Sequence, residues 1–287
     1  MNINWYPGHM KKSLDKIRES LKMVDIVAEL VDARIPISSR NPVINDILKD
    51  SPRLIIFNKV DMADPVETRK WIAHFQSQNI PVVEFNSITD KKTEKIYQKA
   101  RVLLHEKFER NKGKDITSDL IKMMVVGIPN VGKSTFINNV SRKRGTKVGN
   151  KPGVTRINQW IKTDSNILLL DTPGVLWPKL DTPDKGQSLA FTGAIKDENL
   201  DLENLTFNLI ELIAKRHPEM LVKRYGVDVN VETIELMDAI GRKVGAISRG
   251  NEIDYYKLSV LFLDDFRKLR IGRITLERIE DLSINVN

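Results

Sequence analysis

A phosphate-binding loop is the strongest chemical pattern in the sequence. The segment GIPNVGKST, residues 127–135, matches the spacing G-x-x-x-x-G-K-[ST] and lies between an apolar run and a helical pattern. Its glycines allow successive backbone N–H groups to point at phosphate oxygens, and the start of the following helix adds partial positive charge. Lys133 is expected to reach the β- and γ-phosphates as a catalytic group, and Ser134 to offer its hydroxyl to Mg²⁺. The residues predicted to surround the phosphates are Pro129, Asn130, Val131, Gly132, Lys133, Ser134 and Thr135.

A second pattern, NKVD at residues 58–61, follows the apolar run RLIIF. A carboxylate at this place can accept hydrogen bonds from N1–H and the 2-amino group of guanine, which adenine does not present in that arrangement. Alone the pattern is ambiguous, because Asn, Lys and Asp also favour exposed turns. Beside a phosphate loop it predicts guanine recognition by Asn58, Lys59 and Asp61. Asn86 and Ser87, which end a third apolar run, are a weaker candidate for backbone support of the base.

A third pattern, DTPG at residues 171–174, closes the apolar run ILLL. Asp171 is predicted to bind Mg²⁺ through water, and the Gly174 N–H to contact the γ-phosphate, which would make this loop sensitive to phosphate loss. Thr155, in NKPGVTR, is predicted to complete the Mg²⁺ shell and to contribute to catalysis in the triphosphate state. Thr146 and Thr163 are alternatives, but Gly153 favours a mobile loop around Thr155.

Val175 follows DTPG, where many GTPases carry a glutamine that orients the attacking water. A valine cannot hydrogen-bond water, so slow intrinsic hydrolysis is expected unless another group serves. Asn130 is similar to the asparagine of potassium-activated GTPases, which implies K⁺ as a cofactor; the alternative is an amide that bonds its own loop. His9, after a Pro-Gly turn, is a candidate to position water; the alternative is a structural residue at a helix start.

Short apolar runs alternate with helical patterns over the first two-thirds of the chain. This alternation predicts an α/β fold with a mainly parallel sheet and helices on both faces. The expected strands are residues 25–32, 53–59, 81–86, 121–127 and 167–174, and helical stretches include 65–78 and 91–110.

The pattern changes to amphipathic helices near residue 195, with the segments 202–217, 231–245 and 255–270. A Pro-, Asp- and Gly-rich stretch around 178–187 favours a link. We therefore expect a nucleotide domain at 1–180, a linker at 181–194 and a small all-α C-terminal domain at 195–287.

Net charge differs between the two parts. The chain carries +8 overall, but residues 1–194 carry +11 and residues 195–287 carry −3. Excess positive charge attracts polyanions such as nucleic acid, although a merely lysine-rich surface is the alternative. In the acidic tail, Arg267, Lys268, Arg270 and Arg273 form a local basic group compatible with RNA contact.

The absence of cysteine excludes disulfides and thiolate metal sites, and no apolar run reaches 18 residues, so no membrane helix or signal peptide is expected.

The order of the motifs is unusual, because NKVD precedes the phosphate loop by about 70 residues. This order resembles the circularly permuted GTPases. Together with the start WYPGHM, the run DTPGVLWPK and the helical tail, it resembles the ribosome biogenesis GTPase A (YlqF-type) family over essentially the whole chain. The resemblance implies a cytoplasmic protein that binds GTP and GDP, hydrolyses GTP and assists late assembly of the large ribosomal subunit, acting as a monomer on its precursor.

Permutation also has a mechanical consequence, because the chain leaves the DTPG loop directly toward the helical tail. We expect the nucleotide state to be coupled to that tail. An RNA-binding assembly factor in which GTP is mainly a structural ligand, with incidental turnover, is the alternative function.

Overall fold

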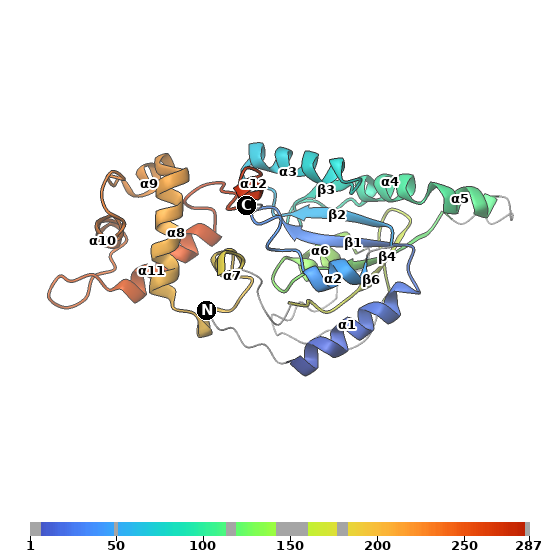
Figure 1. Cartoon of the computed structure of the whole chain (residues 1–287), viewed down its shortest axis with the longest axis horizontal. Helices are drawn as coiled ribbons and strands as arrows, with labels where there is room; N and C mark the ends of the chain where they lie inside the picture. Colours follow the sequence, from blue (N-terminus) through green and yellow to red (C-terminus); the bar gives the residue numbers. More distant parts are fainter. Residues whose placement is uncertain (1–6, 49–50, 113–118, 142–159, 177–182, 285–287) are drawn as a thin grey trace. The chain divides into compact units, whose positions relative to one another are not determined.

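The chain forms two compact units in the computed structural model (Figure 1). The model describes residues 7–48, 51–112, 119–141, 160–176 and 183–284; for residues 7–10, 111–112, 183, 199 and 283–284 it describes the backbone alone. The sheet unit comprises Asn2–Asp181 and Thr275–Asn287, and the helical unit comprises Thr182–Ile274.

A six-stranded sheet with the order β3-β2-β1-β4-β6-β5 organises the sheet unit. All neighbouring strands are parallel except β5, which pairs antiparallel with β6. The predicted mainly parallel, permuted α/β sheet is thus confirmed. Only β5 was not predicted, because its three residues are too short to form an apolar run. The strands are β1 (Ile26–Asp32), β2 (Arg53–Asn58), β3 (Val82–Phe85), β4 (Ile121–Val126), β5 (Trp160–Lys162) and β6 (Ile167–Asp171).

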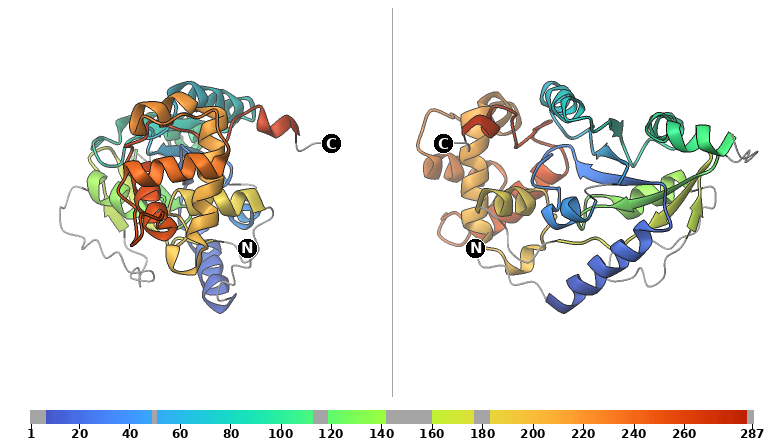
Figure 2. Two further views of the ribbon diagram at one scale, coloured as in Figure 1. Left: turned by 90° about the vertical axis from the view of Figure 1, so that its left-hand side faces the viewer. Right: turned by 45° about the vertical axis from the view of Figure 1, so that its right-hand side comes forward.

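Helices cover both faces of this sheet (Figures 1 and 2). Ile17 of α1 and Ile44 of α2 pack with Val27 of β1, while Trp71 of α3 packs with Val31 of the same strand. Val27 and Val31 lie four positions apart, so these helices share one face. Phe136 of α6 meets Phe85 of β3 on the opposite face. The helices are α1 (Pro7–Leu21), α2 (Pro42–Ile47), α3 (Pro65–Ser77), α4 (Glu94–Leu103), α5 (His105–Lys112), α6 (Lys133–Val140) and α12 (Asp281–Ile284).

The first helix begins earlier than the sequence suggested. Pro7 and Gly8 form the first turn of α1, where we expected a separate turn. Proline suits this place because its fixed φ is helical and its missing N–H would have no intrahelical partner. His9 therefore lies inside α1, and its side chain is outside the part of the chain that the model describes.

The helical unit is arranged around α8, which contacts α7, α9, α10 and α11. Three helices match the expected amphipathic segments. Helix α7 occupies much of the stretch expected as a linker, and α9 begins at Pro218, directly after the end of α8. The helices are α7 (Pro183–Phe191), the short 3₁₀ helix η1 (Asp197–Asn199), α8 (Leu202–Arg216), α9 (Pro218–Tyr225), α10 (Thr233–Lys243) and α11 (Tyr255–Arg267).

The last part of the chain belongs with the sheet, whereas we expected the helical domain to continue to residue 287. We call Thr275–Leu282 the return segment. Leu276 N donates to the Arg34 carbonyl at 2.8 Å, and Trp71 Nε1 donates to the Glu277 carbonyl at 2.8 Å. Ile279 and Leu282 pack against the core that contains Trp71. Such irregular contacts leave no periodic pattern in the sequence.

The Glu277 carboxylate makes the most specific contact of the return segment. It accepts hydrogen bonds from the backbone N–H groups of Ile37, at 2.6 Å, and Ser38, at 3.0 Å. Both belong to the loop between β1 and α2, residues 33–41. One side chain therefore satisfies two backbone donors that are remote in sequence.

In the part of the chain that the model describes, no helix is both long and apolar enough to cross a membrane.

We predict that Glu277→Ala lowers the free energy of unfolding by ~1–3 kcal/mol, because it leaves two loop N–H groups without their acceptor. Urea unfolding followed by circular dichroism measures this change. Glu280→Ala is the matched control, since the Glu280 carboxylate pairs with Lys70 and its side chain is 61% exposed; its loss should be below about 1 kcal/mol. Equal losses in both variants would contradict the assigned role of Glu277.

Candidate nucleotide site

The predicted motifs meet at one edge of the sheet. NKVD begins at the last residue of β2, Asn86 follows β3, the phosphate loop follows β4, and Asp171 ends β6. These strands are parallel, so their carboxyl ends share one edge whatever their order along the chain. The structure thus brings together all the predicted site residues that it describes. Thr155 lies outside the described residues, as does the side chain of His9.

Asn58 connects three of these loops. Its side-chain amide nitrogen donates to the Val131 carbonyl at 2.8 Å, and its amide oxygen accepts from Ser87 N at 3.0 Å. Asn58 and Ser87 are buried, at 2% and 3% exposure. The base-recognition loop is therefore fixed against both the phosphate loop and the loop after β3.

Lys59 makes a second connection to the phosphate loop. Its ammonium donates to the Asn130 carbonyl at 3.0 Å. Lys59 and Asn130 both have φ in the left-handed region, at 59° and 57°, so each backbone takes a conformation that non-glycine residues rarely adopt. Burial lowers the pKa of Lys59, and the charge of Asp32 opposes this effect. Asp61, two residues further on, is half-buried and adds negative charge near Lys59.

The loop after β3 is built around Asn86. Its side-chain oxygen accepts from Ile88 N at 2.9 Å and from Thr89 N at 3.3 Å, which closes a local turn. Asn139 of α6 donates to the carbonyls of Ser87 and Ile88. The sequence analysis did not identify Asn139. The feature that could have identified it is an amide side chain about two turns into the helix that follows the phosphate loop. The Asn86 side chain therefore stabilises the turn of its own loop. The backbone of this loop contacts Asn58 through Ser87 N.

The phosphate loop leads into α6, which begins at Lys133. The Lys133 ammonium donates to the carbonyls of Gly127, at 3.2 Å, and Ile128, at 3.4 Å. Burial lowers the pKa of Lys133 to about 8, against the opposing charge of Asp171. Val131 is buried, whereas Ser134 and Thr135 are exposed in the first turn of α6.

Gly132 is required at its position for two reasons. Its φ is 102°, in the left-handed region, and a Cβ added there would overlap the amide nitrogen of Asn58. The contact between Asn58 and the loop is thus possible only because residue 132 lacks a side chain.

Asp171 and Ser134 supply the oxygen donors expected for Mg²⁺. Asp171 ends β6 beside Lys133; burial raises the pKa of its carboxyl group, and the charge of Lys133 counteracts this. A carboxylate and a hydroxyl suit a hard cation that keeps several waters and binds phosphate oxygens. The residues present therefore fit a magnesium ion that arrives with a nucleotide.

The DTPG loop lies against the phosphate loop. Thr172 Oγ1 donates to the Val125 carbonyl at 2.6 Å, and Val175 N donates to the Gly127 carbonyl at 3.4 Å. A Cβ on Gly174 would stand 2.8 Å from the Lys133 ammonium and 3.1 Å from the Pro129 backbone. Gly174 thus lies directly beside Lys133 and has no room for a side chain.

Val175 has a packing role that the sequence did not reveal. It is 2% exposed and belongs to the core cluster that contains Ile17 and Met124. Its carbonyl accepts from the Asn41 side chain at 2.9 Å. The residue after DTPG therefore anchors the loop, and its side chain points into the core.

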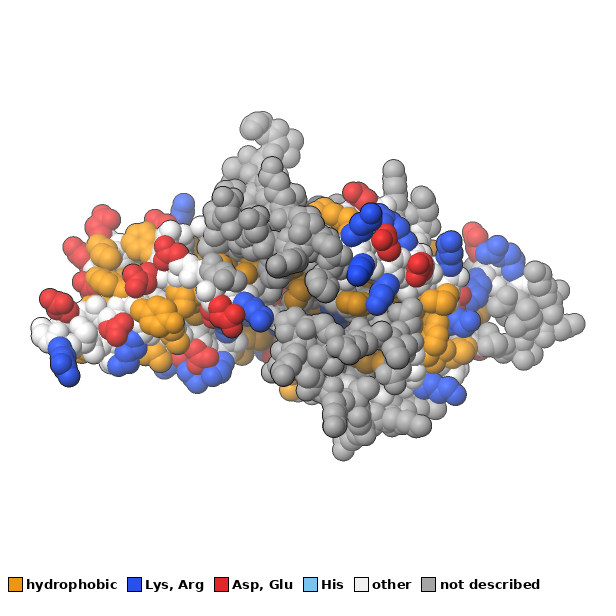
Figure 3. Space-filling view, turned by 90° about the horizontal axis from the view of Figure 1, so that it is seen from below, with side chains coloured by type: hydrophobic (Ala, Val, Ile, Leu, Met, Phe, Trp, Pro, Cys, Tyr) orange, Lys and Arg blue, Asp and Glu red, His pale blue; other side chains and the backbone are white. Residues whose placement is uncertain are grey.

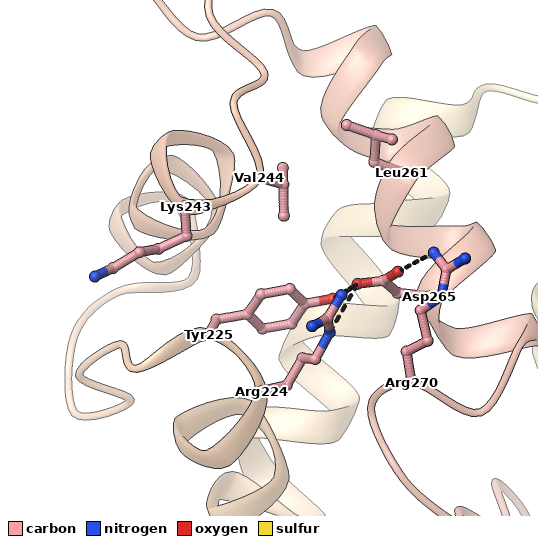
Figure 4. A pocket seen from close by; sticks show the side chains of 7 residues that line it. All are labelled: Arg224, Tyr225, Lys243, Val244, Leu261, Asp265 and Arg270. Carbon is pink, nitrogen blue, oxygen red and sulfur yellow. Dashed lines mark hydrogen bonds and ion pairs between the residues drawn. The ribbon is translucent and has the colours of Figure 1, made fainter.

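A pocket of the helical unit is lined by Asp265 and by arginines that hydrogen-bond to it (Figure 4). The Asp265 carboxylate accepts from Arg224 at 2.7 Å, Arg270 at 2.8 Å and the Tyr225 hydroxyl at 3.1 Å. Burial favours the neutral acid, but these hydrogen bonds hold the pKa of Asp265 below its usual value. The arginines that line this pocket are therefore paired within the unit.

Three members of the basic group expected in the tail, Arg267, Lys268 and Arg270, also have partners within the helical unit. Arg267 donates to the carbonyls of Ala190 and Phe191 and to Asp197, and Lys268 pairs with Asp264. On the face seen in Figure 3, acidic and basic side chains of the helical unit (left-hand part) are interspersed. Arg267 consequently helps to pack this unit.

Comparisons with known proteins find related GTPases. A family model described as "50S ribosome-binding GTPase" matches residues 122–218. Ribosome biogenesis GTPase A of Bacillus licheniformis is 43% identical over 98% of this chain and 100% of its own length. Mitochondrial ribosome-associated GTPase 1 of Bos taurus is 32% identical over 96% of this chain and 88% of its own length. The crystal structure of GNP-bound YlqF from T. maritima has a TM-score of 0.64 and 25% identity, covering 93% of this chain and 98% of that one.

We predict that Gly174→Ala lowers GTP turnover by ~10–100-fold, because the added methyl must displace the DTPG loop from Lys133. Single-turnover hydrolysis, with GDP binding measured in parallel, tests this. Pro173→Ala is the control: it changes the same loop without adding an atom near the phosphate loop. Wild-type turnover in the Gly174→Ala variant would contradict the assigned place of Gly174.

Proposed function

We propose that this chain, which belongs to the ribosome biogenesis GTPase A family, binds and hydrolyses GTP as an assembly factor for the large ribosomal subunit. The observation that carries the proposal is the meeting of the guanine-recognition and phosphate loops through Asn58 and Lys59. Family membership supports the ribosomal role, since its members are named for ribosome biogenesis. The proposed partner is the precursor of the large subunit. The chain is proposed to bind it as a monomer in the cytoplasm.

Guanine selectivity is assigned to the NKVD loop. Asp61 accepts the two donors of the guanine edge, Asn58 holds the loop on the phosphate loop, and the backbone of Asn86 and Ser87 supports the base. An adenine would leave the Asp61 carboxylate without partners, which favours GTP over ATP.

Phosphate binding and hydrolysis are assigned to the loops after β4 and β6. Lys133 leaves its carbonyl partners to hold the β- and γ-phosphates, and the Gly174 N–H contacts the γ-phosphate. Mg²⁺, when bound with the nucleotide, neutralises charge on these phosphates. Ser134, Thr155 and Asp171 would hold it, Asp171 through water. The side-chain oxygen of Asn130 is the proposed ligand for K⁺.

The nucleotide state is proposed to be coupled to the helical unit. The chain enters that unit after the DTPG loop and leaves it through the return segment. Asn41 holds Val175 at one end of the 33–41 loop, and Glu277 holds Ile37 and Ser38 in its middle. Displacement of Gly174 on phosphate loss thus acts on a loop that also binds the return segment.

Intrinsic turnover should be slow, because Val175 offers water no hydrogen bond, and large-subunit precursor particles should raise it at least ~10-fold. His9→Ala should abolish most of this increase while GDP affinity stays unchanged, because His9 is proposed to position water. Steady-state phosphate release with and without particles measures both effects.

Two results would contradict these assignments. Turnover unaffected by particles that bind the protein would favour an RNA-binding factor with a structural nucleotide. Full stimulation of the His9→Ala variant would remove the catalytic role of His9, with Lys12→Ala as a control for the charge of the same helix.

A further inference from the structure

A buried carboxylate lies behind the guanine-recognition lysine. Asp32 is the last residue of β1, is 2% exposed and faces the end of β2, where its register partner is Asn58. Its Oδ2 accepts from the Lys59 ammonium at 2.9 Å. The sheet register places this carboxylate beside the NKVD loop, although 26 residues separate them in the sequence.

Asp32 is shared by two cations with different surroundings. Arg34 binds it through two side-chain nitrogens, at 3.0 and 2.8 Å, and is itself buried. The Lys59 side chain is 23% exposed and also reaches the Asn130 carbonyl. Lys59 therefore connects the carboxylate to the phosphate loop.

We infer that Asp32 is a positioning residue for guanine-nucleotide binding, which acts by holding the Lys59 ammonium on the phosphate loop. The inference deepens the proposed function and rests on it. A lysine side chain has four rotatable bonds and prefers water when it has no partner. The Asn130 carbonyl alone would hold the Lys59 ammonium weakly, because it is an uncharged acceptor. The Asp32 carboxylate, which Arg34 holds in position, accepts a stronger, charge-assisted hydrogen bond.

The strained backbone makes this anchor more important. With φ at 59°, Lys59 directs its side chain back along the sheet edge toward β1. The same ammonium then lies between Asp32 and Asn130, so the carboxylate, the lysine and the phosphate loop form one line of contacts. Loss of the carboxylate would release the lysine toward solvent and leave Asn58 as the remaining side chain of the NKVD loop that is seen to bind the phosphate loop.

The test is a double-mutant cycle on GDP affinity. Asp32→Asn keeps the shape of the side chain and removes its charge; it should weaken GDP binding about tenfold, the effect of one charge-assisted hydrogen bond. In a Lys59→Met background the same substitution should cause no further loss, because Asp32 acts through Lys59. Isothermal titration gives all four dissociation constants.

Two controls separate positioning from general stability and from base reading. Glu29→Gln removes the charge of another buried carboxylate of β1, which pairs with Arg40, and should lower the melting temperature while GDP affinity stays near the wild-type value. Asp61→Asn should shift preference from guanine toward xanthine nucleotides, whereas Asp32→Asn should weaken binding without that shift. If Asp32→Asn does not fold, Asp32→Glu keeps the charge but displaces it, and should give a smaller loss that also disappears in the Lys59→Met background.

An unchanged GDP affinity in the folded Asp32 variants would overturn the inference, as would a loss that persists undiminished in the Lys59→Met background. Failure of the wild-type chain to bind GDP would instead contradict the proposed function itself.

Discussion

The site depends on one constraint: the carboxyl ends of neighbouring parallel strands lie at the same edge of a sheet. Strands β2, β1, β4 and β6 are parallel neighbours. Three of them end at a polar residue, and β4 is followed by the phosphate loop. The NKVD loop, proposed to recognise guanine, follows β2, and the phosphate loop follows β4, with β1 between these two strands. Strand pairing decides which loops lie beside one another. A chain with permuted motif order can therefore place the same loops around one site.

The loop between β1 and α2, residues 33–41, has the widest connections in the sheet unit. It begins at Ala33, whose N–H donates to the Asn58 carbonyl at 2.9 Å, and it ends at Asn41, whose side chain donates to the Val175 carbonyl. In its middle, Glu277 holds two backbone N–H groups. The NKVD loop, the residue after DTPG and the return segment therefore all contact this one short loop. The proposed coupling therefore rests on this shared loop as well as on the chain connection after DTPG.

Most of the fold and the nucleotide loops could be predicted from the sequence. Buried parallel strands appear as short apolar runs, and the phosphate loop and NKVD have residue types dictated by backbone geometry and base chemistry. The return segment could not be predicted, because its contacts rest on single side chains such as Glu277 and leave no periodic signal. Asp32 was missed for a related reason: only the register of β1 against β2 shows that it faces Lys59. The internal partners of Arg267 could not be predicted either, because charge in a sequence does not show which groups lie beside it.

The most direct test of one site built from four strand ends is hydrogen exchange with and without GDP and Mg²⁺. The account predicts that GDP slows exchange together in four segments that are far apart in sequence: residues 58–61, 86–89, 127–135 and 171–175. Protection confined to 127–135 would contradict it, because a phosphate loop would then bind the nucleotide without the base-recognition and DTPG loops.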